Sequence, residues 1–491
     1  MRRSKIVILG LIFVLAVGGG FLALMLSKEV KNGELIYGEN LTEQEKAWIS
    51  EIVPEGQKFS EDFTIDAKYS DTAPIAENTE ILADILVPVT DFTSEKTGIS
   101  GSEFSALDPA SDATLISINE LTPEKKLLAV DGEYYLDDFK NGAKYRIITI
   151  DKENEEISEI VAKLREKMPK FTGKAGTLTI NQTGVTALTR KLQAKLNETG
   201  DGAYFAEKIK DFLAKTDLTH ISNEVSFADN CRTDSATTTL CADPRMIETI
   251  KAIGTDIVEL TGNHNNDWAT AANLATIKTY KDAGLKIFGG GENEEKARKP
   301  LEIDQKGTKI TWIGINNSTS TKANGQGAVG DKPGANIYDE ETVKKQIATA
   351  KENGDFVIVD VQFFECYSYP TRGTEMPSCD APIENQANFF RHLVDLGADL
   401  VVGTSAHQPQ TYELYRGKPI YYGLGNLFFD QIAWPGTTRS LVLTHYFQNG
   451  KLIQTRISPT VYDASFQTRL MDQADAEDFL RRLLVASPKD K

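Results

Sequence analysis

The residues best suited to chemistry lie in short polar clusters that follow apolar runs. One cluster extends from Thr261 to Asp267, directly after the apolar run that ends at Leu260. Within it, a protonated His264 can supply the leaving-group proton in ester hydrolysis. Asp267 lies three residues later, where it can fix the tautomer of the imidazole and raise its basicity. The spacing therefore predicts an acid–base pair of His264 and Asp267.

Other clusters offer carboxylate, amide and cationic groups. Glu224 and Glu365 are hard oxygen donors or general bases, and His407 is a further ligand or acid. Arg190 can hold an anionic substrate. We predict catalytic roles for His264, Asp267 and Glu224, and substrate binding by Arg190 and Asn426. The expected metal ligands are Asn223, Glu224, Asn263, His264, Glu365 and His407.

Each of these residues also has an ordinary structural interpretation. A single Asn-His pair in a loop is more often a turn or a helix cap, and Glu224 alone reads as a surface or capping carboxylate. His220 lies in an apolar strand, His392 in mid-helix and His445 in mid-strand, so we expect these three to be structural. Recurrence of polar clusters after several apolar runs favours a site over a set of unrelated turns.

From Gly176 onward, strand-like and helix-like stretches alternate, which is typical of an α/β domain with a largely parallel, buried sheet. Asn449-Gly450 predicts a hairpin between strands at 440–447 and 451–457. In open α/β sheets, sites lie beyond the carboxyl ends of strands, where the polar clusters fall. The expected strands are 177–180, 218–221, 256–260, 286–288, 309–315, 356–361, 399–402 and 419–422. The expected helices are 187–196, 204–214, 244–253, 270–283, 340–352, 382–396 and 474–485.

The N-terminus predicts a membrane anchor. Ile6 to Leu26 is apolar and without charge, and Arg2, Arg3 and Lys5 precede it. About 21 helical residues span roughly 30 Å, enough to cross a bilayer. The basic flank stays in the cytoplasm, so the remaining chain is expected outside. A cleaved signal peptide is the competing interpretation.

The composition changes along the chain divide it into five expected parts. Residues 1–26 form the basic flank and anchor, 27–63 a polar stalk, and 64–170 a small α/β domain. No catalytic group of residues is evident in 64–151. Residues 171–460 form the domain with the polar clusters, and 461–491 a helical tail.

Four cysteines bracket two polar loops. The simplest of the three possible pairings joins Cys231 to Cys241 and Cys366 to Cys379. Each bond would close a short loop and stabilise the fold by roughly 2–3 kcal/mol. Free buried thiols are the alternative, but an oxidising compartment favours disulfides.

Composition excludes several classes of protein. The 491 residues are 40% hydrophobic and 25% charged, so wholesale disorder is excluded. The net charge is −17, which argues against a general nucleic-acid binder because phosphate contacts need clustered Lys and Arg. Five histidines, three of them expected to be structural, allow one divalent ion more readily than two.

The motifs, in this order, resemble the CapA family of capsule-synthesis proteins, which are linked to poly-gamma-glutamate. The resemblance covers about 176–457, and its most specific segments are 262–267, 395–403 and 417–426. It implies a metallophosphatase-like four-layer α/β/β/α sandwich, membrane attachment and an outward-facing domain. Asn223, Glu224, Asn263, His264, Asp267 and His407 match the positions that form the family's cleft.

The chain departs from the family pattern at three places. Thr183-Gly184 stands where many members have Gly-Asp, so one carboxylate ligand is missing. The segment 362–365 replaces a His-Trp-Gly-like run, and 403–407 keeps only the last His of a Gly-His-His-Pro-His-like run. These departures put a two-metal centre in doubt.

The resemblance leads us to expect a metal-assisted hydrolase or transferase in surface-polymer synthesis, acting on an anionic polymer or a phosphate-type substrate. Other subunits of a synthesis complex are expected partners, and nucleic acid is not. The rival interpretation is a non-catalytic polymer-binding or export subunit with a decayed metal site. The net charge of −17 weighs against it, since it would repel polyglutamate unless cations line the cleft.

Overall fold

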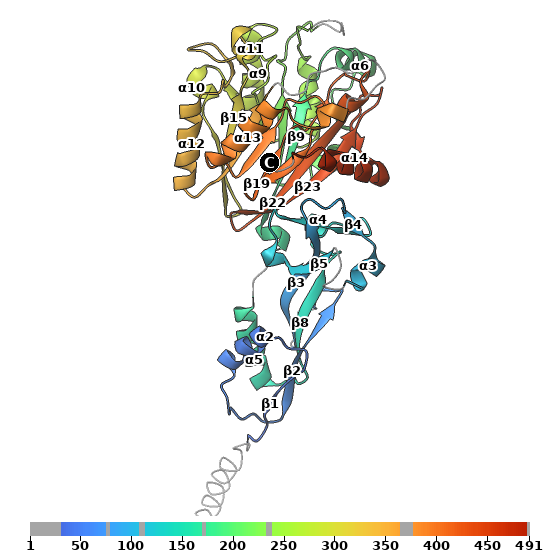
Figure 1. Cartoon of the computed structure of the whole chain (residues 1–491), viewed down its shortest axis with the longest axis vertical. Helices are drawn as coiled ribbons and strands as arrows, with labels where there is room; N and C mark the ends of the chain where they lie inside the picture. The colour runs from blue at the N-terminus through green and yellow to red at the C-terminus, as the bar shows by residue number, and fades with distance from the viewer. Residues whose placement is uncertain are drawn as a thin grey trace, which may run out of the picture. The chain divides into compact units, whose positions relative to one another are not determined.

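The computed structural model describes residues 31–74, 79–107, 113–168, 173–231, 238–363 and 377–488. They belong to two compact units (Figure 1). Unit 1 takes its residues from 1–87, 115–119 and 140–171. Unit 2 comprises the described parts of 88–114, 120–139 and 172–491.

Unit 1 is a mixed sheet with two helices on one face. The helices α2 (Glu43–Ile52) and α5 (Glu155–Lys167) bury Ile49, Ile160 and Leu164 against the sheet. Thr42 and Glu45 cap the first turn of α2 reciprocally. In order across the sheet, the strands are β1 (Leu35–Tyr37), β2 (Phe63–Ser70), β8 (Lys144–Ile150), β3 (Glu80–Asp91) and β5 (Thr114–Ser117).

Residues 31–63 are folded into unit 1, whereas the sequence predicts a polar stalk there. Leu41, Val53 and Phe59 are buried in the core of unit 1. The exposed charged residues of α2, such as Glu43 and Glu51, hide this narrow apolar face from a reading of composition alone. Arg146 of β8 donates to both carboxylate oxygens of Glu45, at 2.9 and 2.8 Å.

Unit 2 contains two large sheets. The alternation predicted from the sequence is seen in both, with parallel central strands and antiparallel additions at the sides. In order across the first sheet, the strands are β12 (Lys286–Phe288), β11 (Ile257–Glu259), β10 (Leu218–Asn223), β9 (Thr177–Thr186), β22 (Arg439–Gln448), β23 (Lys451–Val461) and β24 (Arg469–Leu470). A further strand, β21 (Asn426–Phe428), also pairs with β9. The second runs β14 (Leu301–Gln305), β15 (Thr308–Asn316), β17 (Phe356–Gln362), β18 (Leu400–Gly403), β20 (Lys418–Tyr421), β19 (Tyr412–Tyr415).

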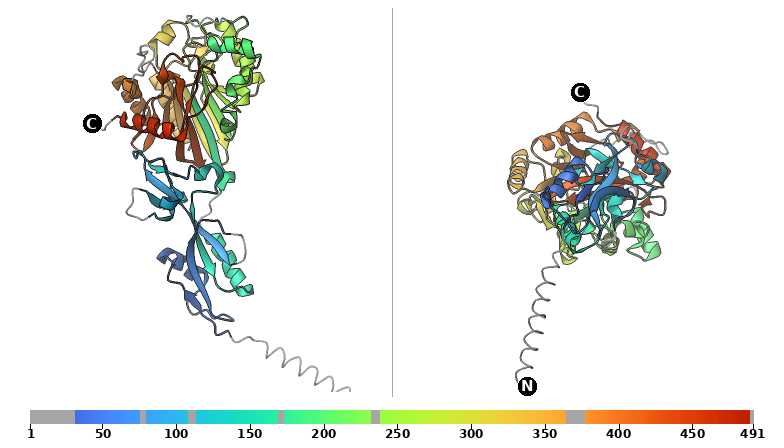
Figure 2. Two further views of the ribbon diagram at one scale, coloured as in Figure 1. Left: turned by 90° about the vertical axis from the view of Figure 1, so that its right-hand side faces the viewer. Right: turned by 90° about the horizontal axis from the view of Figure 1, so that it is seen from below.

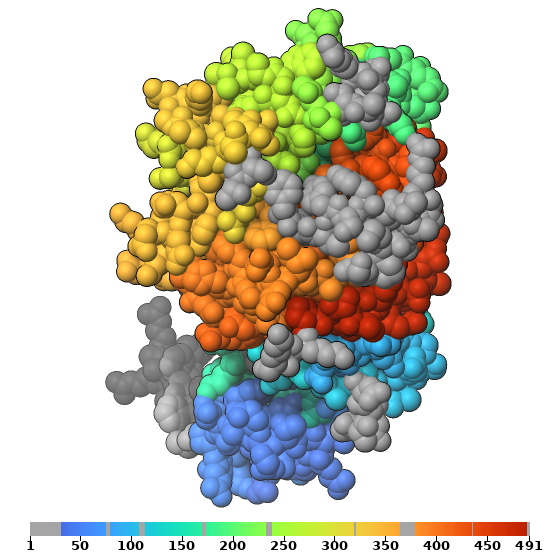
Figure 3. Space-filling view, turned by 45° about the horizontal axis from the view of Figure 1, so that its top comes forward, coloured from blue at the N-terminus to red at the C-terminus, as the bar shows by residue number. Residues whose placement is uncertain are grey.

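The two sheets pack face to face, and helices cover their outer faces (Figure 2). Ile180, Trp312 and Leu443 are among the side chains buried between the sheets. The outer layers are α6 (Lys191–Thr199), α8 (Ile247–Ala252) and α9 (Thr270–Asp282) on the first sheet, and α12 (Glu340–Glu352) and α13 (Glu384–Asp395) on the second. Figure 3 shows the segments that carry α12 and α13 side by side in yellow and orange. The layer order is therefore α/β/β/α.

Two segments outside the expected 171–460 also pack into unit 2. Helix α14 (Gln473–Val485) places Phe479 and Leu483 in the core between the sheets. Part of the segment expected as a separate small domain lies here too. Asp137 accepts hydrogen bonds from Tyr446 and Arg456, and the rings of Phe92 and Tyr412 are 5.5 Å apart.

Cys231 and Cys241 form the predicted disulfide, with a Cα–Cα distance of 5.7 Å. Cys379 is also disulfide-bonded, and Cys366, its expected partner, lies outside the described residues. The expected anchor at 6–26 lies outside them as well. Among the helices from residue 31 onward that the structure describes, none is long and apolar enough to cross a membrane.

We predict that Glu45→Ala destabilises unit 1 by about 3–5 kcal/mol, because it leaves the buried Arg146 guanidinium without its carboxylate. The side chains of Glu45 and Arg146 are only 5% and 8% exposed. Thermal unfolding of the full chain, with limited proteolysis to follow unit 1, measures the effect. Glu43→Ala removes an exposed carboxylate from the same helix and serves as the control. Equal stability of the two variants would show that residues 31–63 do not support unit 1.

Candidate functional site

The predicted site residues gather at the carboxyl ends of the strands of unit 2. Glu224 follows β10, and His264 follows β11. Arg190 follows β9, which runs through Thr186 rather than ending at residue 180 as predicted. The extension is stable because β10, β21 and β22 all pair with β9 and bury it. Asn426 begins β21, which pairs with the end of β9.

His264 and Asp267 form the predicted pair. His264 Nδ1 lies 2.6 Å from Asp267 Oδ2. Two further donors fix the carboxylate: Leu240 N donates to Oδ2 at 2.8 Å and Gln326 Nε2 to Oδ1 at 2.7 Å. Gln326 also accepts from Asn266 N at 2.7 Å, so it joins both sides of the turn that carries His264. No sequence signal marks Leu240 or Gln326, because both reach Asp267 from distant loops.

The pair sets the charge of the imidazole. Burial alone would lower the pKa of His264, but the hydrogen bond and charge of Asp267 outweigh it and raise the pKa above its ordinary value. The side chain of His264 remains 27% exposed. With Nδ1 directed to Asp267, Nε2 is the ring nitrogen left to face a substrate.

Glu224 is a buried carboxyl group beside this pair. Within the described residues, neither of its carboxylate oxygens meets a donor in hydrogen-bonding geometry. Burial raises the pKa of Glu224 to about 7, while the nearby charge of His264 opposes the rise. Gln362 also lies close enough to favour the charged form. Glu224 can therefore gain or lose a proton near neutral pH.

A glycine allows the two elements to approach. The loop after β11 crosses the backbone of Glu224 at Gly262, where a Cβ atom would lie 2.7 Å from Glu224 Cα. Val225 and His264 form a parallel bridge just beyond this crossing. Any side chain at position 262 would push His264 away from Glu224.

His407 and Arg190 are the other ionisable residues that were predicted for the site and that the structure describes. His407 Nδ1 lies 2.8 Å from Asn426 Oδ1. Burial, with the nearby charges of His264 and Arg190, lowers the pKa of His407 to about 4 against the opposing hydrogen bond of Asn426, so its ring is neutral at pH 7. Arg190 pairs with Asp430, and its guanidinium carbon is 4.9 Å from the centre of the Phe429 ring.

Two residues with strained backbones flank the cluster. Arg190 has φ 50° and ψ −106°, and Ala269 has φ 83° and ψ 155°. The second conformation is one that glycine adopts almost exclusively, and each such residue costs about 1–3 kcal/mol. Strain of this kind is typical of segments whose geometry serves a site rather than stability.

The amide residues are already engaged. Asn223 Nδ2 donates to Val225 O at 2.7 Å, so this side chain holds its own turn. Gln362 Nε2 lies 3.4 Å from Asn263 Oδ1. Glu365, the remaining predicted ligand, lies outside the described residues.

The predicted metal ligands do not form a compact carboxylate and imidazole cluster. Across the ranges that the structure describes, no three His, Cys, Asp or Glu side chains come together closely enough to hold one ion. Among the predicted ligands that the structure describes, the buried Glu224 carboxylate has no donor in hydrogen-bonding geometry and would suit a cation. These residues alone do not fit a two-metal centre, which needs several such ligands around each ion.

The three histidines predicted to be structural lie apart from the pair. His220 and Asp360 are fully buried between the sheets, with His220 Nε2 3.0 Å from Asp360 Oδ2. His445 Nε2 lies 3.0 Å from Gln182 Oε1, and Gln182 in turn donates to Asp360 Oδ1 at 2.7 Å. His392 is on the outer helix α13, with 40% of its side chain exposed.

Comparison with known proteins identifies the family. Residues 179–431 match the family described as "Bacterial capsule synthesis protein PGA_cap". The capsule biosynthesis protein CapA of Bacillus anthracis is 29% identical over 231 residues, which cover 46% of this chain and 53% of that protein. The PGA biosynthesis protein CapA of Bacillus subtilis (strain 168) is 26% identical over 233 residues, 47% of this chain and 57% of that protein. The match thus spans about half the length of these relatives.

Among solved structures, the NAD nucleotidase (NadN) of Haemophilus influenzae aligns with a TM-score of 0.32 at 12% identity, over 63% of this chain and 62% of that one. A likeness this weak carries no argument, so the relation to metallophosphatases stays a prediction. The family match is stronger evidence than this structural likeness, because it covers more than half of the chain and includes every predicted site residue. This chain belongs to the bacterial capsule synthesis family.

Proposed function

We propose that this protein is anchored in the cell membrane and acts outside the cytoplasm in making or exporting an anionic surface polymer of the poly-gamma-glutamate type. The observation that carries the proposal is the family match over 179–431. The names of the relatives from Bacillus anthracis and Bacillus subtilis supply the class of polymer.

The sequence and the disulfide support the location. Ile6 to Leu26 has the length and composition of a membrane-spanning helix, with basic residues on its N-terminal side. The bond between Cys231 and Cys241 is typical of a protein that folds in an oxidising compartment. Other subunits of a polymer-synthesis complex are the partners that such a location favours.

The chemistry we propose is acid–base catalysis of hydrolysis or transfer at a phosphate ester or an amide-linked acyl group. Glu224, with a pKa of about 7, takes a proton from the attacking nucleophile. His264, protonated and oriented by Asp267, gives a proton to the leaving group. The positive charges of His264 and Arg190 favour an anionic substrate, and Asn426 orients His407 beside them.

A divalent ion at this site would complete its ligand shell with amide, water or substrate oxygens. Fewer than three carboxylate or imidazole groups meet at any one point of the described chain. The proposed proton transfers therefore run through Glu224 and His264 alone.

The second candidate function is a non-catalytic subunit that binds the anionic polymer during export. The shortage of metal ligands favours it. The chain, however, carries a net charge of −17, which repels an anionic polymer. Binding without catalysis would depend on overall charge and would weaken with salt.

We predict that His264→Ala lowers the surface polymer at least about tenfold when it replaces the native protein, because the general acid is lost. Asp267→Asn should lower it too, since the amide cannot stabilise an imidazolium. The polymer is quantified as glutamate released from the cell surface by acid hydrolysis, at equal protein levels.

His392→Ala alters an exposed histidine and is the matched control, which should leave the polymer unchanged. Normal polymer in cells carrying His264→Ala would contradict the catalytic role and leave the binding subunit as the explanation. Normal polymer after deletion of the gene would contradict both functions.

We predict that Glu224→Gln is more stable than the natural protein at pH 8 but not at pH 4. The native carboxyl keeps its proton up to a pKa of about 7, whereas the unfolded chain loses it near 4.5. The natural protein therefore loses stability as the pH rises from 4.5 to 7, by about 3 kcal/mol in all. Glutamine does not titrate and avoids this loss.

Thermal unfolding of the full chain between pH 4 and 8 measures the difference. Glu207→Gln, an exposed carboxylate paired with Lys210, is the control and should follow the natural protein at every pH. A constant difference between Glu224→Gln and the natural protein across this range would mean that Glu224 is charged in the native state.

We predict that the purified full chain retains at most one divalent ion. Elemental analysis after dialysis against Mn²⁺ or Zn²⁺ measures the ratio, and Glu224→Gln should reduce it further. Two ions per chain would show that residues outside the described ranges, such as Glu365, complete a dinuclear centre.

A further inference from the structure

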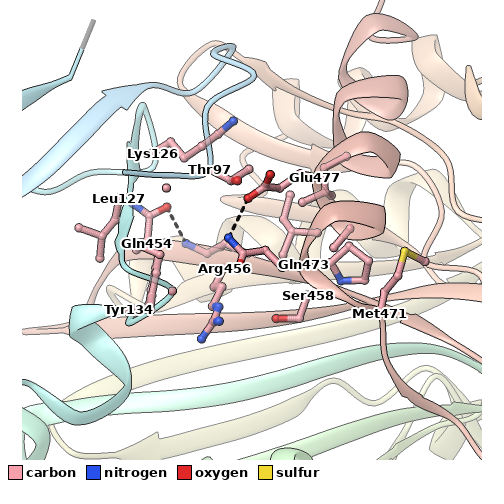
Figure 4. A pocket seen from close by; sticks show the side chains of 18 of the residues that line it. Thr97, Lys126, Leu127, Tyr134, Gln454, Arg456, Ser458, Met471, Gln473 and Glu477 are labelled. Carbon is pink, nitrogen blue, oxygen red and sulfur yellow. Dashed lines mark hydrogen bonds between the residues drawn. The ribbon is translucent and has the colours of Figure 1, made fainter. Parts of the chain in front are cut away.

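Unit 2 has a cavity of about 700 Å³ that contains none of the predicted site residues. Its walls come from the segments 92–103 and 123–134, from β23 and from the segment 470–480, which includes the start of α14 (Figure 4). The volume falls in the range of small-molecule sites. The proposed function makes no use of this cavity.

The walls are mainly apolar. Phe92 and Tyr412 meet edge to face, and Leu470 of β24 and the following Met471 also line the cavity. The apolar lining also includes Ile99, Leu127, Tyr134, Tyr421, Ile457 and Leu480. Such a lining binds the hydrocarbon part of a ligand by removing it from water.

Most charged groups at the cavity already have partners. Glu103 accepts from Ser100 N at 2.8 Å, and Asp131 accepts from Gly101 N at 3.0 Å. Glu477 accepts from Gln473 at 3.1 Å. Arg456 pairs with Asp137 and lies over the ring of Tyr134.

Lys126 is the exception. Its ammonium group donates to the carbonyl oxygen of Ser94, and no carboxylate of the described residues lies within ion-pair distance. The side chain is half-buried, and burial lowers its pKa to about 8, against the opposing influence of Glu95. A cation on an apolar wall without a carboxylate is costly, so an anionic group of a ligand would complement it.

We propose that this cavity binds an amphipathic anion, a molecule with an apolar chain that ends in a carboxylate or a phosphate. The head group pairs with Lys126 Nζ, where Thr97 and Gln454 also line the cavity, and the chain lies along Leu127, Ile457 and Leu480.

The test uses the full chain in lipid nanodiscs and three probes with the same twelve-carbon chain: dodecanoate, dodecyl phosphate and dodecanol. Each carries a photoreactive diazirine near the methyl end. We expect the probes to label peptides from 92–134 and 454–480. At least one anion should reach half-saturation at a concentration about tenfold lower than that of the alcohol. The tighter anion identifies the head group as a free carboxylate or a lipid-type phosphate.

Variants separate the charge from the cavity. Lys126→Met should weaken the labelling by the anions about tenfold and leave that by dodecanol unchanged, whereas Lys126→Arg should retain anion labelling. Lys125→Met is the matched control, because Lys125 is exposed and paired with Asp91. Leu480→Trp fills the cavity and should weaken all three probes.

Labelling confined to other peptides would overturn the proposal, as would equal labelling by the anions and the alcohol in the natural protein. Anion labelling that survives in a folded Lys126→Met variant would also overturn it. Comparison of the three probes on the natural protein decides the matter even if a variant fails to fold.

Discussion

The two sheets of unit 2 pack face to face through a layer of buried side chains that includes Ile180, Trp312 and Leu443. This layer is mostly apolar, and its polar members His220, Asp360 and Gln182 bond to one another. It therefore fixes the relative positions of strands from both sheets. The loops after β10 and β11 then have little freedom. Gly262 must pass over Glu224, and the cluster around His264 follows from that crossing. The position of the site is thus a consequence of packing far beneath it.

The same burial determines the charges at the site. Burial raises the pKa of Glu224, whose carboxylate has no donor in hydrogen-bonding geometry. Asp267 raises the pKa of His264 because it stabilises the charged imidazole. The partner of His407 Nδ1 is the amide of Asn426, and burial keeps the ring neutral. Three ionisable residues close together in space therefore respond differently to pH because their partners differ.

Much of the fold could be predicted from the sequence, because hydrophobic periodicity reflects local structure. The predicted strand at 286–288 and the helix at 340–352 have the observed bounds, and the hairpin around Asn449-Gly450 is present. The stalk was wrongly predicted because α2 shows a narrow apolar face among many charges. Membership of residues 88–114 and 120–139 in unit 2 depends on distant contacts, such as Asp137 with Tyr446, that no local pattern reveals.

The candidate site could be predicted from the sequence to about the same extent as the fold. Polar residues after strands can be recognised from the sequence, so the proximity of His264, Asp267 and Glu224 could be predicted. Their supporting partners were not, because Gln326 and the backbone of Leu240 reach Asp267 from elsewhere in the chain. The number of metal ligands that meet in space likewise depends on side-chain directions that spacing alone does not determine.

The pairing of β9 has a practical consequence for the limits of the family match. The matched segment ends at residue 431, yet β22 begins at Arg439 and forms a long antiparallel ladder with β9. A chain shortened to 179–431 would lose this neighbour and expose the backbone donors and acceptors of a central strand as a new sheet edge. Such edges pair with other chains, so the shortened protein would tend to aggregate. The smallest soluble form of this domain must therefore extend through the hairpin of β22 and β23.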